Sequence, residues 1–294
     1  MRELLSPGSF RWNARESYSS IARRLGVDED TVRKRLRKAR LNGLLSGFHL
    51  IPNPRLLDTE SSVLELDVDG EERKTLAISQ LKLLEGVVLI VNFHGKRLRV
   101  VLYYENDRAL GRKVELMQLI CGSPAELQWK ESFPPFHMKM RETDWKIFKS
   151  LRRDARKSLS EVAAQVRVSS RTVKRRLSLM EERNAFFLMP VTSYEKSIVT
   201  MCSFTVHSLD YAKKRMIDDK IRSSVDRIIF SNTSAQQYSV FTVLCNNYST
   251  AEETLGLIRK TDGVRQVSMG IVKEVIPVSD WVDEQIAKRL EYPF

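Results

Sequence analysis

The sequence predicts an α+β protein built from two winged-helix/helix-turn-helix domains, each followed by a βαββαβ ferredoxin-like domain. Three observations lead to this fold class. Positive charge is concentrated in two blocks, and the chain matches itself at an offset of 141 residues. After each basic block, the spacing of apolar residues changes from that of helices to that of strands.

Length and composition indicate a globular protein with more than one domain. The 294 residues are 42% apolar and 29% charged, which excludes a collagenous or wholly disordered chain. The longest apolar runs, such as Val87–Val91, are far shorter than the roughly 20 residues of a membrane-spanning helix. The first residues show no signal peptide, so we expect a cytoplasmic, nucleoid-associated protein with no membrane partner.

The distribution of charge points to a polyanionic partner. Lysine and arginine exceed aspartate and glutamate by 12 over the whole chain. Residues 11–40 carry a net charge of +6 and residues 146–183 carry +8, so the rest of the chain is close to neutral. One such block is often only a solvated helix face, but two blocks at matched positions favour binding to nucleic acid.

The two basic blocks belong to an internal repeat. Identical residues recur at the offset of 141, in the pairs Ser17 and Ser158, Ala22 and Ala163, Thr31 and Thr172, and Gly122 and Gly263. Two prolines within residues 133–136 favour a linker between the copies. We therefore predict helix-turn-helix domains at residues 1–50 and 141–190, ferredoxin-like domains at residues 58–133 and 195–278, and a C-terminal helix at residues 279–294.

The second copy begins with three predicted helices. Apolar residues at helical spacing near residues 147–151 indicate the first, and a short second helix spans about residues 160–165. Ser169 is a good N-cap for a third helix that ends near residue 184. A tight turn followed by a basic amphipathic helix is typical of a helix-turn-helix, whose last helix enters the DNA major groove.

The first copy repeats this pattern with two differences. Ser6 and Pro7 match residues 147 and 148 of the second copy, so the first helix should be interrupted there. The third helix opens with Asp28-Glu29-Asp30, which suits the helix dipole but repels phosphates. We therefore expect the first copy to bind DNA more weakly than the second, or differently.

Each copy continues with apolar segments that are typical of strands. In the first copy, strands near 62–68, 87–93, 98–104 and 125–129 alternate with helices near 71–84 and 107–120. In the second, strands near 198–206, 227–230, 238–245 and 264–275 alternate with helices near 210–222 and 250–260. This order predicts an antiparallel sheet with both helices on one face, so the other face must be covered by a second sheet.

These segments resemble the Lrp/AsnC family of archaeal and bacterial transcription regulators. The resemblance is clearest in TDWKIFKSLRRDARKSLSEVAAQVRVSSRTVKRRLSLMEERNAFF at residues 143–187, and next in SYSSIARRLGVDEDTVRKRLRKARLNGLL at residues 17–45. Members normally carry one such module and dimerise through the sheet domain. The resemblance therefore implies a sequence-specific DNA-binding transcription regulator whose tandem modules form an intramolecular pseudo-dimer or a homo-oligomer.

The resemblance also implies an amino-acid or other small-molecule effector, because the family's sheet domain often senses one. In the family, the turn between the second and third strands carries a glycine followed by an aspartate. The first copy keeps Gly95 but has Leu98 in place of the acid. The second copy reads Asn232-Thr233-Ser234-Ala235 and has no glycine. Both copies therefore depart from the family pattern at this turn.

The candidate DNA contacts are basic and small polar side chains of the helix-turn-helix segments. Arginine can form two hydrogen bonds with guanine, and both arginine and lysine neutralise phosphates. In the second copy the candidates are Arg156, Lys157, Ser169, Ser170, Arg171, Lys174, Arg175 and Ser178. In the first copy they are Arg33, Lys34 and Arg37. The expected partner is double-stranded DNA. The alternative is that these side chains only form solvated helix faces.

Two other functions stay open. A chromatin-type architectural protein would bind DNA with little sequence preference. Sirohaem decarboxylases resemble the same family and would need a histidine and arginine set, for which His94 beside Lys96 and Arg97 is the only hint. The four histidines and three cysteines are scattered, without zinc-ligand spacing. We therefore expect no enzyme activity, no cofactor and no metal.

Overall fold

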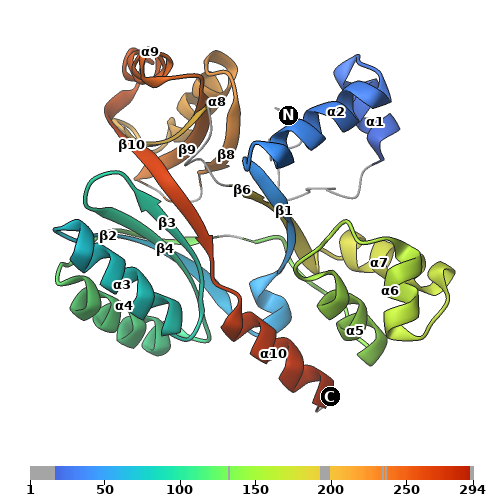
Figure 1. The fold of residues 1–294 in the computed structure, drawn as a ribbon. Helices are drawn as coiled ribbons and strands as arrows, with labels where there is room; N and C mark the ends of the chain where they lie inside the picture. Colours follow the sequence, from blue (N-terminus) through green and yellow to red (C-terminus); the bar gives the residue numbers. More distant parts are fainter. Residues whose placement is uncertain (1–16, 132, 193–198, 234, 236, 292–294) are drawn as a thin grey trace.

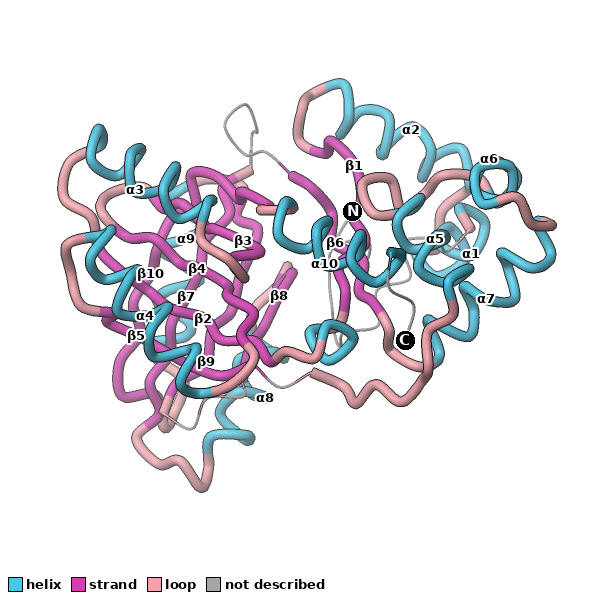
Figure 2. The backbone as a smooth tube through the Cα atoms, turned by 90° about the horizontal axis from the view of Figure 1, so that it is seen from below, coloured by secondary structure: helices cyan, strands magenta, loops and turns pink. Residues whose placement is uncertain are grey.

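The computed structural model describes residues 17–131, 133–192, 199–233, 235 and 237–291. It has a region rich in strands and a region rich in helices, which lie side by side (Figures 1 and 2). The strand-rich region is one eight-stranded sheet with four helices, and the helix-rich region surrounds a two-stranded ribbon. Within the described residues, no helix is both long and apolar enough to cross a lipid bilayer.

The first helical unit contains α1 (Tyr18–Leu25) and α2 (Glu29–Leu41). Both helices have side-chain caps: Ser17 accepts a hydrogen bond from the backbone N–H of Ser20, and Asp28 accepts one from that of Thr31. Gly26 forms the turn between them in the left-handed conformation, with φ of 63°. The interruption expected at Ser6 and Pro7 lies outside the described residues.

The second helical unit contains α5 (Glu142–Leu151), α6 (Leu159–Val166) and α7 (Ser170–Glu182). Ser158 and Glu161 form a reciprocal capping box at the start of α6, and Ser169 caps α7. The inward faces of these helices are buried, as their apolar spacing predicts. The short turn between the two helices contains Arg167, the C-cap of α6, and Ser169, the N-cap of α7, and gives a helix-turn-helix arrangement.

A strand from each helical unit joins the two units together. Strand β1 (Leu45–Pro52) pairs in antiparallel fashion with β6 (Phe186–Thr192), and a short 3₁₀ helix, η2 (Pro54–Leu57), follows β1. The backbone of β1 also contacts the loop after α5, where the N–H of Leu50 donates to the carbonyl of Arg152 at 2.9 Å. One apolar core runs through both units, so their buried faces pack together.

The first sheet unit has the order β2 (Glu60–Asp67), α3 (Glu71–Leu83), β3 (Val87–Phe93), β4 (Arg97–Tyr104), α4 (Asp107–Cys121), β5 (Ala125–Glu131). The second has the order β7 (Thr200–Ser208), α8 (Lys214–Ser224), β8 (Ile228–Asn232), β9 (Tyr238–Cys245), α9 (Tyr248–Arg259), β10 (Val264–Pro277). Both units place their four strands in the same spatial order. In each, the helices cover one face of the sheet and enclose a separate core.

The long strand β10 makes one sheet of the two units. Its first part pairs with β7 of its own unit, and its last part, from Val272 to Pro277, pairs with β3 of the other. The far edges also meet, because the side chain of Asn232 on β8 donates to Glu131 on β5 at 3.2 Å. The two faces that carry no helices pack against each other within one chain, where Val63 and Trp129 of the first sheet unit form a buried cluster with Tyr238 and Val240 of the second.

The C-terminal helix α10 (Asp280–Glu291) connects the helix-rich and strand-rich regions. The ring of Trp281 lies edge-on to Tyr103 of β4, with ring centres 6.3 Å apart. On its other side, Asp283 binds the guanidinium of Arg153, which follows α5, at 2.7 Å. The sequence predicted this helix but not its packing partners.

Candidate nucleic-acid interface

The outer face of α7 is basic and exposed. Arg171, Lys174, Arg175 and Ser178 all lie on it, opposite the buried face of the helix. The first turn of α7 contains no acidic residue. Among the residues that the structure describes, the three basic side chains have no hydrogen-bonding or ion-pair partner. Ser170 is exposed beside them, whereas the hydroxyl of Ser169 caps the helix by accepting from the N–H of Thr172 at 3.1 Å.

A buried ion pair holds α7 in one orientation on α5. The guanidinium of Arg176 donates two hydrogen bonds to the carboxylate of Asp144, and this pairing raises the pKa of Arg176. Asp144 also accepts from the backbone N–H of Arg141 at 2.8 Å. A bidentate contact restricts rotation of α7 about its own axis. The structure thus assigns Arg176 a structural role, while its counterpart Arg35 in α2 is exposed.

The outer face of α2 carries charge that is compensated locally. Arg33, Lys34 and Arg37 are exposed, as expected. However, the guanidinium of Arg33 pairs with Glu29 one turn earlier, at 3.0 Å from Nε to Oε1. Hydrogen bonds from Thr31 lower the pKa of Asp28, which keeps the capping carboxylate ionised. The end of α2 that would meet bases is therefore less positive than the same end of α7.

Arg156 and Lys157, the residues expected to clamp phosphates, are both half-buried and contact the protein itself. The guanidinium of Arg156 lies 4.6 Å from the centre of the Tyr18 ring, and burial lowers the pKa of this arginine. The Nζ of Lys157 donates to the backbone carbonyl of Ser150 at 3.0 Å. Their contact with DNA stays a prediction, and these internal contacts compete with it.

Tyr18 forms a junction between the two helical units that the sequence analysis missed. The guanidinium groups of Arg33 and Arg156, one from each unit, both lie 4.6 Å from the centre of its ring. Cations at this distance from an aromatic ring are attracted to it. The sequence signal is only an aromatic residue directly after the Ser17 cap, and it does not reveal a partner in the other copy.

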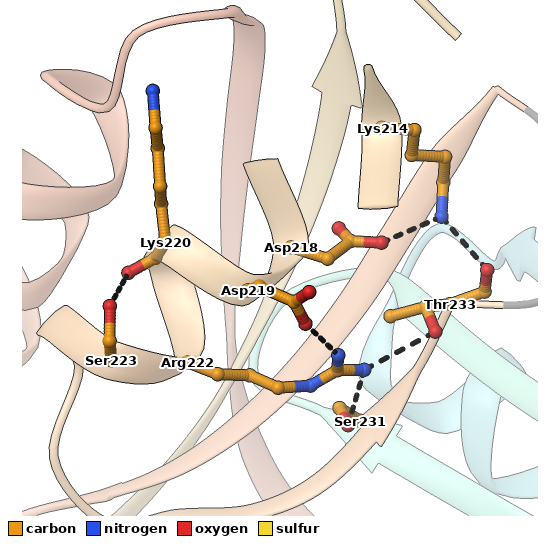
Figure 3. A network of polar contacts seen from close by, with 8 residues as sticks. All are labelled: Lys214, Asp218, Asp219, Lys220, Arg222, Ser223, Ser231 and Thr233. Carbon is orange, nitrogen blue, oxygen red and sulfur yellow. Dashed lines mark hydrogen bonds and ion pairs between the residues drawn. The ribbon is translucent and has the colours of Figure 1, made fainter. Parts of the chain in front are cut away.

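The turns where an effector would be expected are bound internally by lysines. In the first sheet unit, the Nζ of the buried Lys74 donates to the backbone carbonyl of Phe93 at 2.6 Å. In the second, the Nζ of Lys214 donates to the carbonyl of Thr233 at 2.8 Å and to Asp218 at 3.0 Å (Figure 3). Both sheet units thus bind a carbonyl at this turn with a lysine of their own. Binding of an effector stays a prediction.

The two basic residues that, with His94, hinted at an enzyme each lie beside a carboxylate. His94 is exposed at the turn after β3. Lys96 pairs with Asp67 at 3.0 Å, and Arg97 lies 3.7 Å from the carboxylate of Glu65. Within the described part of the chain, no cluster of three histidine, cysteine or acidic side chains is arranged to hold a metal ion. Among the described residues, both basic neighbours of His94 in the sequence thus lie beside a carboxylate.

The second helical unit is similar to winged helix-turn-helix DNA-binding domains. Residues 140–184, which contain α5, α6 and α7, match the family model described as winged helix-turn-helix DNA-binding. With the ferredoxin-like sheet units, this confirms the predicted α+β fold class.

Two curated archaeal proteins are similar to part of the chain. The HTH-type transcriptional regulator Ptr1 of Methanocaldococcus jannaschii is 33% identical over 85 residues, which are 29% of this chain and 57% of that protein. An uncharacterized HTH-type transcriptional regulator of Pyrococcus furiosus, PF1231, is 38% identical over 78 residues, which are 26% of this chain and 53% of that protein. The chain thus spans little more than half the length of these relatives.

Solved structures of one protein are similar over nearly the whole chain. The siroheme decarboxylase NirDL aligns with 94% of this chain and 94% of its own, with a TM-score of 0.56 and 16% sequence identity. The likeness therefore extends over both the helix-rich and the strand-rich region. At this identity it shows a shared fold.

Proposed function

We propose that this protein is a transcription regulator of Lrp/AsnC type that binds specific sequences in double-stranded DNA. The observation that carries the proposal is the outer face of α7, where three basic side chains are exposed and have no partner among the described residues. Matches to the winged helix-turn-helix family and to two archaeal regulators support it. The two modules act as a pseudo-dimer within one chain.

In this proposal the two helix-turn-helix units have different tasks. Arg171 lies in the first turn of α7, the part of such a helix that usually meets base edges, and it can donate two hydrogen bonds to guanine. The matching turn of α2 carries Glu29 and Asp30 instead. We propose that α7 reads sequence, and that Arg33, Lys34 and Arg37 of α2 contact phosphates.

Substitution of Arg171 tests the proposal directly. A duplex selected by the wild-type protein from a random library serves as the specific site, and a scrambled duplex as the reference. Arg171→Ala should weaken specific binding by roughly 1–3 kcal/mol and relax one base position. Arg33→Ala and Lys34→Ala should weaken binding to both duplexes alike. Arg215→Ala, which removes an exposed charge from α8, is the matched control and should change little.

Three results would count against the proposal. If Arg171→Ala keeps the ratio of specific to scrambled binding while a change in α2 abolishes it, α2 is the reading helix. If the wild-type protein selects no sequence at all, the architectural alternative is supported. If affinity for duplex DNA does not fall with salt, phosphate contacts are absent, because each neutralised phosphate contributes a slope of about −0.9 in log affinity against log salt.

The fold of NirDL favours one second candidate, an enzyme that acts on a tetrapyrrole. The solved structures include NirDL in complex with an iron-uroporphyrin III analogue. An absorption titration of this protein with an iron porphyrin tests the candidate, because binding shifts the porphyrin band. A saturable shift that His94→Ala abolishes would favour the enzyme, and an unchanged spectrum would reject it.

A further inference from the structure

The turn of the second helix-turn-helix contains an arginine in a backbone conformation that suits glycine. Arg167 follows α6 with φ of 59° and ψ of 48°, in the left-handed region. At the offset of 141 residues, the same position of the first unit is Gly26, with φ of 63° and ψ of 31°. A residue with a Cβ atom has a strained backbone in the left-handed region, whereas glycine adopts this conformation readily.

Packing within the protein does not account for this arginine. Arg167 is exposed, and its side chain has no hydrogen-bonding or ion-pair partner among the described residues. The turn itself is held by backbone bonds that both units share. The N–H of Val168 donates to the carbonyl of Ala163 at 3.1 Å, and the N–H of Val27 donates to that of Ala22 at 3.0 Å. A glycine would therefore form the same turn with less strain.

The position of Arg167 places its charge beside the candidate DNA surface. It lies two residues before the cap Ser169 and four before Arg171, at the end of α7 that such motifs direct towards DNA. Strained backbone that the fold does not need is typical of functional sites. We propose that Arg167 contacts a DNA phosphate next to the bases that α7 reads. This inference rests on the proposed function.

The variant Arg167→Gly separates a DNA contact from a structural role, because the two roles predict opposite effects. Removal of the strain should leave the Tm unchanged or raise it by about 2 °C. Loss of one phosphate contact should weaken binding to specific and scrambled duplexes alike and make the salt slope shallower by about 0.9. The loss of affinity relative to wild type should then be about 3.5-fold larger at 50 mM salt than at 200 mM.

Two further variants control for charge and for backbone. Arg167→Lys keeps the cation and should keep most of the wild-type salt slope. Arg227→Gly removes an arginine with φ of 60° from the loop between α8 and β8, in the sheet region, and should leave the slope unchanged. Fluorescence anisotropy with a labelled duplex measures the slope, and calorimetry measures the Tm.

The possible failures of the two proposals can be told apart. Suppose that Arg167→Gly shows the same salt slope of DNA affinity as Arg227→Gly, while Arg171→Ala loses specificity. Then the proposal that α7 reads DNA stands, and the proposed phosphate contact of Arg167 is wrong. A fall in Tm with an unchanged slope would assign Arg167 a structural role and also overturn the inference. If Arg167→Gly and Arg171→Ala both bind like wild type, the proposed function fails at this surface.

Discussion

The carboxylate of Asp144 and the guanidinium of Arg176 show how one buried pair positions a candidate binding surface. Asp144 is 0% exposed and Arg176 is 5% exposed, so each charge depends on the other for compensation. The pair lies on the side of α7 opposite the exposed cations. The orientation of the exposed basic stripe therefore depends on a buried contact on the other side of the helix.

Removal of this carboxylate should be strongly destabilising. We expect Asp144→Ala to reduce the free energy of unfolding by about 3–5 kcal/mol, because it leaves Arg176 buried without a counter-charge. Urea denaturation measures the loss. The control variant Glu142→Ala removes an exposed ion pair with Lys146, which lies one helical turn further along α5. It should reduce the free energy of unfolding by less than about 1 kcal/mol. Equal, small losses in the two variants would contradict the structural role of Asp144.

Glu131 predicts a pH dependence of stability at the contact between the two sheet edges. Its carboxylate accepts hydrogen bonds from Ser61 at 3.0 Å and from Asn232 at 3.2 Å. Burial raises the pKa of Glu131 above its ordinary value of 4.5, and the hydrogen bonds from Ser61 and Asn232, together with the charge of Arg99, oppose this only partly. Between pH 4.5 and the raised pKa, Glu131 is therefore protonated in a larger fraction of folded molecules than of unfolded molecules.

Stability should consequently fall as the pH rises from 4.5 to the raised pKa of Glu131, and this contribution should level off above it. Glu131→Gln cannot titrate and should lack the decrease. Urea midpoints of both proteins between pH 4 and pH 8 give the difference curve, in which other titrating groups cancel. Parallel curves for the two proteins would show that Glu131 does not titrate in this window.

At the scale of elements, α10 decides how the helix-rich region sits on the sheet. Trp281 is buried against Tyr103 of β4, and the hydroxyl of Tyr103 donates to the carbonyl of Pro52 at the end of β1. Asp283 binds Arg153 beside α5. One short helix thus contacts the first sheet unit and the second helix-turn-helix at once.

Truncation of this anchor should loosen the connection between the two regions. We expect Trp281→Ala to cost about 3–5 kcal/mol, and amide exchange in α5 to become faster while β9 stays protected. Glu284→Ala, at an exposed position of the same helix, should leave both stability and exchange nearly unchanged. Uniformly faster exchange across the whole chain would contradict an anchoring role and indicate general destabilisation instead.

At the scale of the whole molecule, contacts between strands join the two halves of the chain, among them β1 with β6, β3 with β10, and β5 with β8. The linker at residues 133–136 is therefore not what keeps the halves together. A second chain is not required to cover the inner faces of the sheets. The association predicted from unpaired sheet faces is found within one chain.

Cleavage of the connecting segment tests this arrangement. A protease site inserted after Lys139, an exposed residue in the segment before α5, allows the folded protein to be cut between its halves. Size-exclusion chromatography and native mass spectrometry should find both fragments in one particle with the mass of the intact chain. Two fragments that separate as soluble monomers would contradict a shared sheet and a shared core.

Local signals in the sequence were sufficient for much of the fold and for the basic stripe. The cap Ser169 and the apolar spacing after it predicted the start and the buried face of α7, because capping and helical periodicity act within a few residues. Arg171, Lys174 and Arg175 followed from the same periodicity. A turn was expected at Arg167, but its left-handed conformation escaped prediction, since arginine is not a typical residue for that backbone conformation.

By itself, the sequence determined the described α-helices and the eight strands of the sheet units, how they repeat at an offset of 141 residues, and where the positive charge lies, but not β1 and β6. Only the tertiary structure decided that β1 pairs with β6, that β10 extends onto β3, and that Tyr18 lies between Arg33 and Arg156. The physical reason is the separation along the chain of the residues that interact. Helix periodicity and caps depend on neighbours along the chain, whereas strand pairing and ring contacts between the copies depend on how two similar halves pack together.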